Sequence, residues 1–289
     1  MQIIETLING LSSGGTYAMI ALGYTMVYGI AKMLNFAHGD VIMVGAYLIY
    51  VFIATTNPLF AILFAVVGCV ILGITIERVA YRPLRGASPL AVLITAIGVS
   101  YLLQSLAQII FGSAPKMVTV FEFGAIEFMG ATVQVASLVT MAVTVVVMIV
   151  LTLFVKYTRL GRAMIAVSED REAAQLMGIN VNGIITITFA IGSSLAALAG
   201  LFYLLKAPNV SFTMGAMPGI KAFTAAVIGG IGSIPGAMLG GILLGVVENI
   251  SNKITAIAPY TDAIEFSILI VILLVRPTGF LGKKRREKV

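Results

Sequence analysis

Apolar runs of about twenty residues recur along the whole chain, and they constrain its fold more than any other feature. A helix needs a run of this length to cross a hydrocarbon core about 30 Å thick. Of the 289 residues, 60% are hydrophobic and only 10% are charged, and the mean hydropathy is +1.07. This composition excludes an ordinary soluble globular domain. Because backbone polar groups must be satisfied inside lipid, we predict an all-α polytopic membrane protein, with a single membrane domain over residues 1–289.

The spacing of the apolar runs predicts about eight membrane segments. Separate segments are expected at about 7–30, 36–55, 59–78, 89–111, 133–155, 183–205 and 262–276. A glycine-rich region at 219–250 consists of two apolar halves joined by a turn at 232–235, and each half is short for a full span. We therefore expect a pair of short or re-entrant helices there, which crosses the membrane either twice or not at all.

Basic residues are distributed unevenly, and their distribution predicts the orientation of the chain. Of the 18 Lys and Arg residues, 14 lie after the first, third and fifth segments or near the C-terminus. By the positive-inside rule these parts face the cytoplasm, so the N-terminus is expected outside and the C-terminus inside. The basic tail at 277–289 directly follows a membrane segment, and we interpret it as a cytoplasmic topology anchor and not as a nucleic-acid-binding patch.

The sequence predicts a short helix within the basic and polar interval 156–182, and residues typical of helix ends stand at both of its ends. Ser168 can cap its N-terminus, and Glu169 and Asp170 place negative charge at the positive end of the helix dipole. Gly178 can adopt the left-handed conformation that ends a helix. A helix this short is marginal alone in water, and its small apolar surface suits docking into a groove on a partner. The alternative is an ordinary interfacial connector between two membrane helices.

Small residues recur at every fourth position in three places, and this spacing lets helices approach closely in a membrane. The three sets are Gly232, Gly236 and Gly240; Ala237, Gly241 and Gly245; and Gly10, Gly14 and Ala18. We predict tight helix packing at these positions. The functional alternative is that the closely packed helices slide to open a path.

The chain has few residues that could carry chemistry. It has one histidine and one cysteine, which cannot form a metal site of the usual His, Cys and carboxylate type, so no metal and no catalytic cluster are expected. Cys69 lies in an apolar run and is expected to be a core residue. The sequence also lacks the Gly-x-x-x-x-Gly-Lys-Ser/Thr phosphate loop, so this chain is not expected to be an ATPase or to bind a cofactor itself.

Polar groups within or beside apolar segments are candidates for a translocation pathway, because they need water or a partner there. Asn35, His38 and Asp40 can be explained as an interfacial helix start in which Asn35 is the cap, or as a polar gate at the mouth of a pathway. Glu248 closes an apolar segment and is expected at the membrane interface. Asn9 is included as a polar residue in the first segment.

The sequence Glu172-Ala173-Ala174, followed after three residues by Gly178, resembles the coupling-helix motif of ABC-importer permeases. The Ile-x-Leu-Pro that follows in the best-known version of the motif is absent. Three further stretches, at 9–23, 34–40 and 225–236, extend the resemblance over nearly the whole chain. Together they resemble the LivH-type permease of branched-chain amino acid ABC importers.

This resemblance implies a multi-pass subunit of a prokaryotic inner membrane. Its implied partners are a second, LivM-type permease, two cytoplasmic ATPases that bind ATP and Mg²⁺, and an external substrate-binding protein. The residues implied to contact an ATPase are Ser168, Glu169, Asp170, Arg171, Glu172, Ala173, Ala174, Leu176 and Gly178. Similar permeases serve urea or short amides, and the alternatives of another class are a stand-alone carrier or channel and an integral-membrane enzyme.

Overall fold

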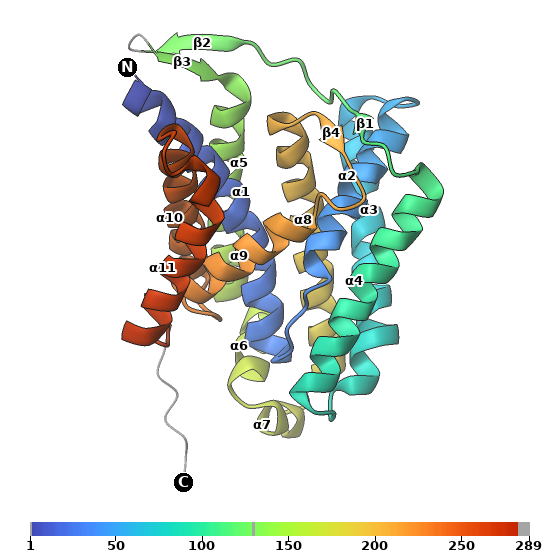
Figure 1. The fold of residues 1–289 in the computed structure, drawn as a ribbon. Coiled ribbons are helices and arrows are strands. Elements are labelled where there is room, and N and C mark those ends of the chain that lie inside the picture. Colours follow the sequence, from blue (N-terminus) through green and yellow to red (C-terminus); the bar gives the residue numbers. More distant parts are fainter. Residues whose placement is uncertain (1, 129–130, 283–289) are drawn as a thin grey trace.

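The computed structural model is a bundle of helices, described for residues 2–128 and 131–282 (Figure 1). Its longer helices are α1 (Gln2–Ala31), α3 (Pro58–Ile76), α4 (Pro89–Phe111), α5 (Val135–Tyr157), α8 (Val181–Lys206) and α10 (Ile234–Lys253). Its shorter helices are α2 (His38–Ile53), α6 (Arg159–Glu169), α7 (Arg171–Leu176), α9 (Ala216–Gly229) and α11 (Thr261–Val275). After α3 the chain continues through a π-helical turn η1 (Glu77–Tyr81) and a 3₁₀ turn η2 (Arg82–Leu84), and another 3₁₀ turn, η3 (Ala258–Tyr260), precedes α11.

The prediction of an all-α multi-pass membrane protein is confirmed. Within the described residues, six helical stretches are long and apolar enough to cross a membrane, and α2 and α9 are shorter apolar helices. In the glycine-rich region we expected two short helices, and only the first of them is short. With 14 residues, α9 is about 21 Å long and short for a span, but α10 continues past Glu248 to Lys253 and its 20 residues reach about 30 Å.

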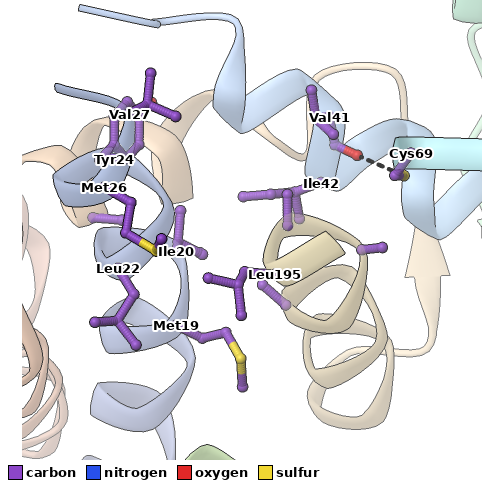
Figure 2. Packing of buried hydrophobic residues seen from close by; sticks show 14 of the residues in the cluster. Met19, Ile20, Leu22, Tyr24, Met26, Val27, Val41, Ile42, Cys69 and Leu195 are labelled. Carbon is purple, nitrogen blue, oxygen red and sulfur yellow. Dashed lines mark hydrogen bonds between the residues drawn. The ribbon is translucent and has the colours of Figure 1, made fainter. Parts of the chain in front are cut away.

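Helix α1 lies in the middle of the bundle. It packs against α5, α8, α9 and α10, and Ala18, Met19, Ile20, Ala21 and Leu22 are completely buried. Figure 2 shows side chains of α1 together with Ile42 of α2 and Leu195 of α8 in the core. Because protein and not lipid surrounds α1, this helix tolerates the glycine, threonine and tyrosine residues that lower its hydropathy.

Helices α1–α4 and α8–α11 share one arrangement of neighbours. Helix α2 packs on α3 and α4, as α9 packs on α10 and α11. Helix α1 packs on α9 and α10, as α8 packs on α2 and α3. Because α1 and α8 run in opposite directions along the bundle (Figure 1), the two sets form an inverted repeat.

The two short helices of this repeat, α2 and α9, meet near their N-terminal ends. A Cβ atom on Gly215 would lie 2.0 Å from the carbonyl oxygen of Gly39, and one on Gly219 would lie 2.9 Å from the Cα atom of Gly39. Glycine is required here because the two backbones are in direct contact.

Short strands lie between the helices. Strands β2 (Ala125–Phe128) and β3 (Ala131–Gln134) form an antiparallel hairpin before α5, and β1 (Lys116–Met117) pairs with β4 (Asn209–Val210). Strand β3 takes the first two residues of the predicted segment 133–155. After α11, the backbone N–H groups of Phe280 and Leu281 donate to the carbonyl oxygens of Ile228 and Gly229, each at 2.9 Å. This part of the predicted tail therefore satisfies the end of α9, whereas residues 283–289 lie outside the described residues.

Candidate functional site

The interval 156–182 folds into two short helices at one end of the bundle (Figure 1). The side chain of Asp170 accepts a hydrogen bond from the Ala173 N–H group at 2.9 Å, so Asp170 is the N-cap of α7. The predicted capping by Ser168 is wrong. The Ser168 hydroxyl donates to the Ile165 carbonyl at 2.7 Å within the last turn of α6, to which Glu169 also belongs. Gly178 has a φ of +81°, the left-handed conformation expected of a helix stop.

Helix α7 presents apolar side chains to the outside. Leu176 is 89% exposed and Met177 is 83% exposed, while Ala174 faces the protein and is buried. Glu172 and Ala173 are also exposed. Two large apolar side chains side by side on an end of the bundle, next to carboxylates, are typical of a surface that another protein covers.

Arg171 connects α7 to the central helix. Its guanidinium donates to the carbonyl oxygens of Ile30, at 3.2 Å, and Ala31. These carbonyl groups belong to the last turn of α1, where they have no partner within the helix and where a cation is favoured by the helix dipole. Burial, and then the nearby charge of Arg85, lower the pKa of Arg171 from its ordinary value. The α6–α7 connection is thus attached through one side chain to the end of α1.

A second polar network, which the sequence analysis did not predict, lies beside this attachment. Glu77 is completely buried, forms an ion pair with Arg85, and accepts a hydrogen bond from the Thr186 hydroxyl at 2.8 Å. Arg85 also donates to Asn182. The network joins the end of α3 to the start of α8. The sequence does contain a signal that could have predicted this network: Glu77 lies at the end of an apolar run, and Arg85 follows eight residues later.

The candidate pathway residues before and within α2 are buried in the core. Asn35, His38 and Asp40 are 5%, 1% and 1% exposed, so other parts of the chain enclose all three side chains. Asn35 does not cap α2, because its side-chain oxygen accepts a hydrogen bond from the Tyr81 hydroxyl at 2.8 Å. The N-cap position of α2 is instead Ala37, without a side-chain bond.

Each of these buried groups has a different neighbour. The His38 ring lies edge-on to Tyr24, with ring centroids 4.8 Å apart, and its Nε2 atom occupies space that a side chain at Gly23 would need. Asp40 accepts a hydrogen bond from Gln104 of α4 at 2.9 Å. A cavity of about 10 Å³ next to Asn35 is large enough for about one water molecule.

Glu248, which we expected at the membrane interface, belongs to a largely buried ionic cluster. It accepts hydrogen bonds from the Tyr17 hydroxyl and from the Lys221 ammonium, each at 2.9 Å, and its side chain is 12% exposed. Lys221 also lies 2.8 Å from Asp262 and 3.3 Å from the completely buried Glu265. The cluster joins α1, α9, α10 and α11. Sequence analysis missed Lys221 and Glu265, although Lys221 is isolated in a long apolar stretch.

Asn9 belongs neither to the buried polar residues around α2 nor to the ionic cluster of Lys221. The Ser137 hydroxyl of α5 donates to the Asn9 side chain at 3.3 Å, which connects α1 to α5. Among the described residues, no group of three His, Cys, Asp or Glu side chains is arranged to hold a metal ion. Cys69 is completely buried, and its thiol donates to the Val41 carbonyl at 3.6 Å, in the core drawn in Figure 2.

The glycine sets belong to two separate contacts of α10. Gly241 and Gly245 face α1, where Cβ atoms would lie 2.4 Å from the Ala18 nitrogen and 2.1 Å from the Gly14 nitrogen. Gly236 and Gly240 face α9 and approach the carbonyl oxygens of Gly229 and Ala225 in the same way. The prediction that Gly232 packs tightly against a neighbouring helix is wrong. This residue lies in the turn before α10 with a φ of +94°, and a Cβ atom there would meet nothing within 4 Å.

Comparison with known proteins identifies the family. The model of the family described as "Branched-chain amino acid transport system / permease component" matches residues 6–273. The chain belongs to this family. The permease is 44% identical to the high-affinity branched-chain amino acid transport system permease protein BraD of Pseudomonas aeruginosa, over 99% of this chain and 98% of that protein. It is 42% identical to LivH of Escherichia coli K12, over 100% of this chain and 98% of that protein. A probable LivH of Methanocaldococcus jannaschii is 29% identical over 91% of this chain and 88% of its own length.

Proposed function

We propose that this permease is the membrane-spanning subunit of an ATP-driven importer that carries branched-chain amino acids across a prokaryotic inner membrane. The observation that carries the proposal is that this chain is 44% identical to BraD and 42% identical to LivH over nearly the full length of each protein. The names of both relatives describe permeases of high-affinity branched-chain amino acid transport systems. The exposed Leu176 at the end of α7 and the exposed Met177 that follows it support a contact with an ATPase.

In this proposal the permease itself binds no cofactor. Two cytoplasmic ATPases bind ATP and Mg²⁺, a second permease of the LivM type completes the membrane part, and an external binding protein delivers the amino acid. The N-terminus is outside and the C-terminus is cytoplasmic, which follows from the positive-inside rule. This orientation also puts α7 on the cytoplasmic side, where an ATPase can reach it (Figure 1).

The mechanism that we propose is alternating access driven from α7. Closure of the ATPases around ATP moves α7, and Arg171 transmits the movement to the end of α1. Because α1 contacts α10 backbone to backbone at Gly14 and Gly245, a shift of α1 must be shared by α10. The two helices would then change the access of the pathway from one face of the membrane to the other.

Affinity purification of the tagged permease from native membranes in mild detergent tests the proposal. We expect two ATPases and a second permease to be recovered with it. Recovery of the permease alone, also after chemical cross-linking, would contradict an importer subunit and would favour a stand-alone carrier or channel.

The orientation is tested with a protease added to sealed membrane vesicles. A C-terminal tag is expected to be removed in inverted vesicles, whose cytoplasmic face is outside, and to stay intact in right-side-out vesicles. Removal of the tag from the right-side-out vesicles would contradict the proposed orientation.

Replacement of Arg171 by alanine is expected to lower ATP-driven uptake about tenfold, since coupling free energies between sites are typically 1–3 kcal/mol. The carbonyl groups of Ile30 and Ala31 lose their charged donor, and α7 can then move without α1. Uptake and ATP hydrolysis are measured together in proteoliposomes containing the purified importer. Hydrolysis should continue while uptake falls.

The matched control is Arg162→Ala, which removes an exposed arginine from α6 in the same connection. It should leave uptake unchanged. If both variants retain normal uptake with the ATPases bound, Arg171 has no part in coupling. A loss of the bound ATPases in Arg171→Ala would instead assign the residue to docking.

A further inference from the structure

We propose that the π-helical turn η1 transmits the movement of α7 to the start of α2, and that Tyr81 is the positioning residue that does so through Asn35. The inference rests on the proposed function, because that function supplies the ATP-driven movement of α7. It adds a second connection to the one that Arg171 makes with α1, and it names the part of the core that this second connection reaches.

The start of α8 is held firmly to α7. Only residues 177–180 lie between the two helices. Within this connection the Ile179 N–H group donates to the Ala174 carbonyl of α7 at 3.0 Å. The Asn180 side chain accepts a hydrogen bond from the Gly183 N–H group at 3.0 Å and so caps α8. A displacement of α7 therefore reaches the first turn of α8.

Two polar side chains of α8 bind the end of α3. The Thr186 hydroxyl donates to the Glu77 carboxylate at 2.8 Å. Arg85, which follows η2, donates both to Glu77 and to the Asn182 side chain. Because α3 and α8 also pack on each other, the start of α8 and the end of α3 move together.

Turn η1 connects this network to α2. It begins at Glu77 and ends at Tyr81, both completely buried, and the Arg82 N–H group donates to the Glu77 carbonyl five residues before it. The Tyr81 hydroxyl donates to the Asn35 side chain at 2.8 Å. The Asn35 carbonyl in turn accepts a hydrogen bond at 3.1 Å from the N–H group of His38, the first residue of α2.

The segment around Asn35 lies against α9. The Phe36 ring is 5.3 Å from the Phe223 ring of α9, measured between centroids, and a cavity of about 10 Å³ is lined by both Asn35 and Phe223. A shift of this segment therefore changes the contact of α2 with α9 at Gly39 and Gly215. In transporters built as inverted repeats, substrate sites lie at the interface between the repeats, and this contact joins the two repeats.

The polar character of the relay argues for a role beyond stability. Replacing both partners of a buried polar contact by apolar groups of the same shape is often neutral or stabilising, so packing alone does not require Glu77 or Tyr81. Hydrogen bonds are directional, and these fix the positions of α8 and of Asn35 relative to η1. Single π turns inside helices are frequent at functional sites.

Tyr81→Phe tests the relay, because it removes one hydroxyl and keeps the ring in the core. The importer is reconstituted in proteoliposomes with its binding protein, and leucine uptake and ATP hydrolysis are measured together. We expect the leucine carried per ATP hydrolysed to fall about fivefold, the lower end of the usual range for coupling between sites. A loss of folded importer lowers both rates in proportion, so a merely structural role would not change this ratio.

Tyr47→Phe is the matched control. Tyr47 of α2 is 2% exposed, and its hydroxyl has no hydrogen-bond partner among the described residues, so the same substitution removes no hydrogen bond. It should leave the ratio of uptake to hydrolysis unchanged. An equal fall of the ratio in both variants would overturn the proposal.

A double variant tests whether Tyr81 acts through Asn35. Asn35→Leu removes the acceptor of the hydrogen bond, so Asn35→Leu alone and the double variant with Tyr81→Phe should show the same ratio as Tyr81→Phe alone. Independent losses that multiply in the double variant would contradict a relay through this contact.

Thr186→Val tests the other end of the relay and does not disturb the Tyr81 contact. It removes the hydroxyl that donates to Glu77 and keeps the shape of the side chain. The ratio is again expected to fall about fivefold. Thr75→Val is its control, because the exposed Thr75 hydroxyl donates only within its own helix, to the Ile71 carbonyl at 2.8 Å.

Two further outcomes separate this proposal from the proposed function. If Tyr81→Phe and Thr186→Val retain the normal ratio while the unmodified importer takes up leucine with ATP, the relay is wrong and the proposed function stands. If the unmodified importer, purified with its partners, shows no ATP-driven uptake of a branched-chain amino acid, the proposed function itself fails.

Discussion

Replacing Lys221 with methionine is expected to destabilise the permease by about 3–5 kcal/mol, the usual cost of removing one partner from a buried ion pair. Lys221 lies within 3.3 Å of carboxylate oxygens from Glu248, Asp262 and Glu265. Methionine fills similar space but has no charge, so the completely buried Glu265 carboxyl group would lose its cation and would have to take up a proton or stay charged without a counterion, and both cost stability.

The effect is measured as heat resistance in detergent, from the fraction of the permease that remains monodisperse after heating. Lys253→Met at the exposed end of α10 is the matched control and should behave as the unmodified chain. The double variant Lys221→Met with Glu265→Gln should recover part of the loss, because it removes one of the unpaired carboxylates. Unchanged heat resistance of Lys221→Met would show that the cluster does not stabilise the fold.

Replacing Gly245 with alanine is expected to separate α1 from α10 and to cost about 3 kcal/mol, at the upper end for overpacking. The added methyl carbon would lie 2.1 Å from the nitrogen and 2.3 Å from the Cα atom of Gly14. Both atoms belong to a helix backbone, so no side chain can turn away to make room. The helices must move apart along a contact that lies in the centre of the bundle.

The amount of monodisperse permease extracted from membranes, and its uptake activity in proteoliposomes, are the measurements for this variant. Gly86→Ala is the matched control, because Gly86 is in an exposed turn and a Cβ atom there meets nothing within 4 Å. We expect Gly245→Ala to lose most of the extractable permease and Gly86→Ala to retain it. Equal amounts of active permease from both variants would contradict the backbone contact between α1 and α10.

Features that depend on neighbouring residues in the chain were predicted well. The expected segment 89–111 coincides with α4, and 183–205 differs from α8 (Val181–Lys206) by two residues at one end and one at the other. Length and hydropathy decide where a membrane helix runs, and both can be counted in the sequence. The conformation of Gly178 belongs to the same class, because a left-handed residue at the end of a helix is a local requirement.

Features that depend on distant partners were predicted poorly. Asn35 was expected to cap α2, but Tyr81, 46 residues away, donates a hydrogen bond to it, so its side chain is used for tertiary contact. Glu248 was expected at the interface because it closes an apolar run, yet it pairs with Lys221 and with Tyr17, which is 231 residues away. A polar group can be buried wherever another part of the chain supplies its partner, and the sequence order does not show which part that is.

The sequence by itself determined the membrane class, the helical segments and the family motifs of this permease, because hydrophobic length, small-residue spacing and caps act over a few residues at a time. Only the tertiary structure decided that the two sets of spaced glycines face α1 and α9 separately, that α2 and α9 meet at Gly39 and Gly215, and that Arg171 binds the end of α1. The physical reason is that these contacts depend on which helices become neighbours. Helix order in space is set by the packing of all the helices together, and the local pattern of any one of them does not contain it.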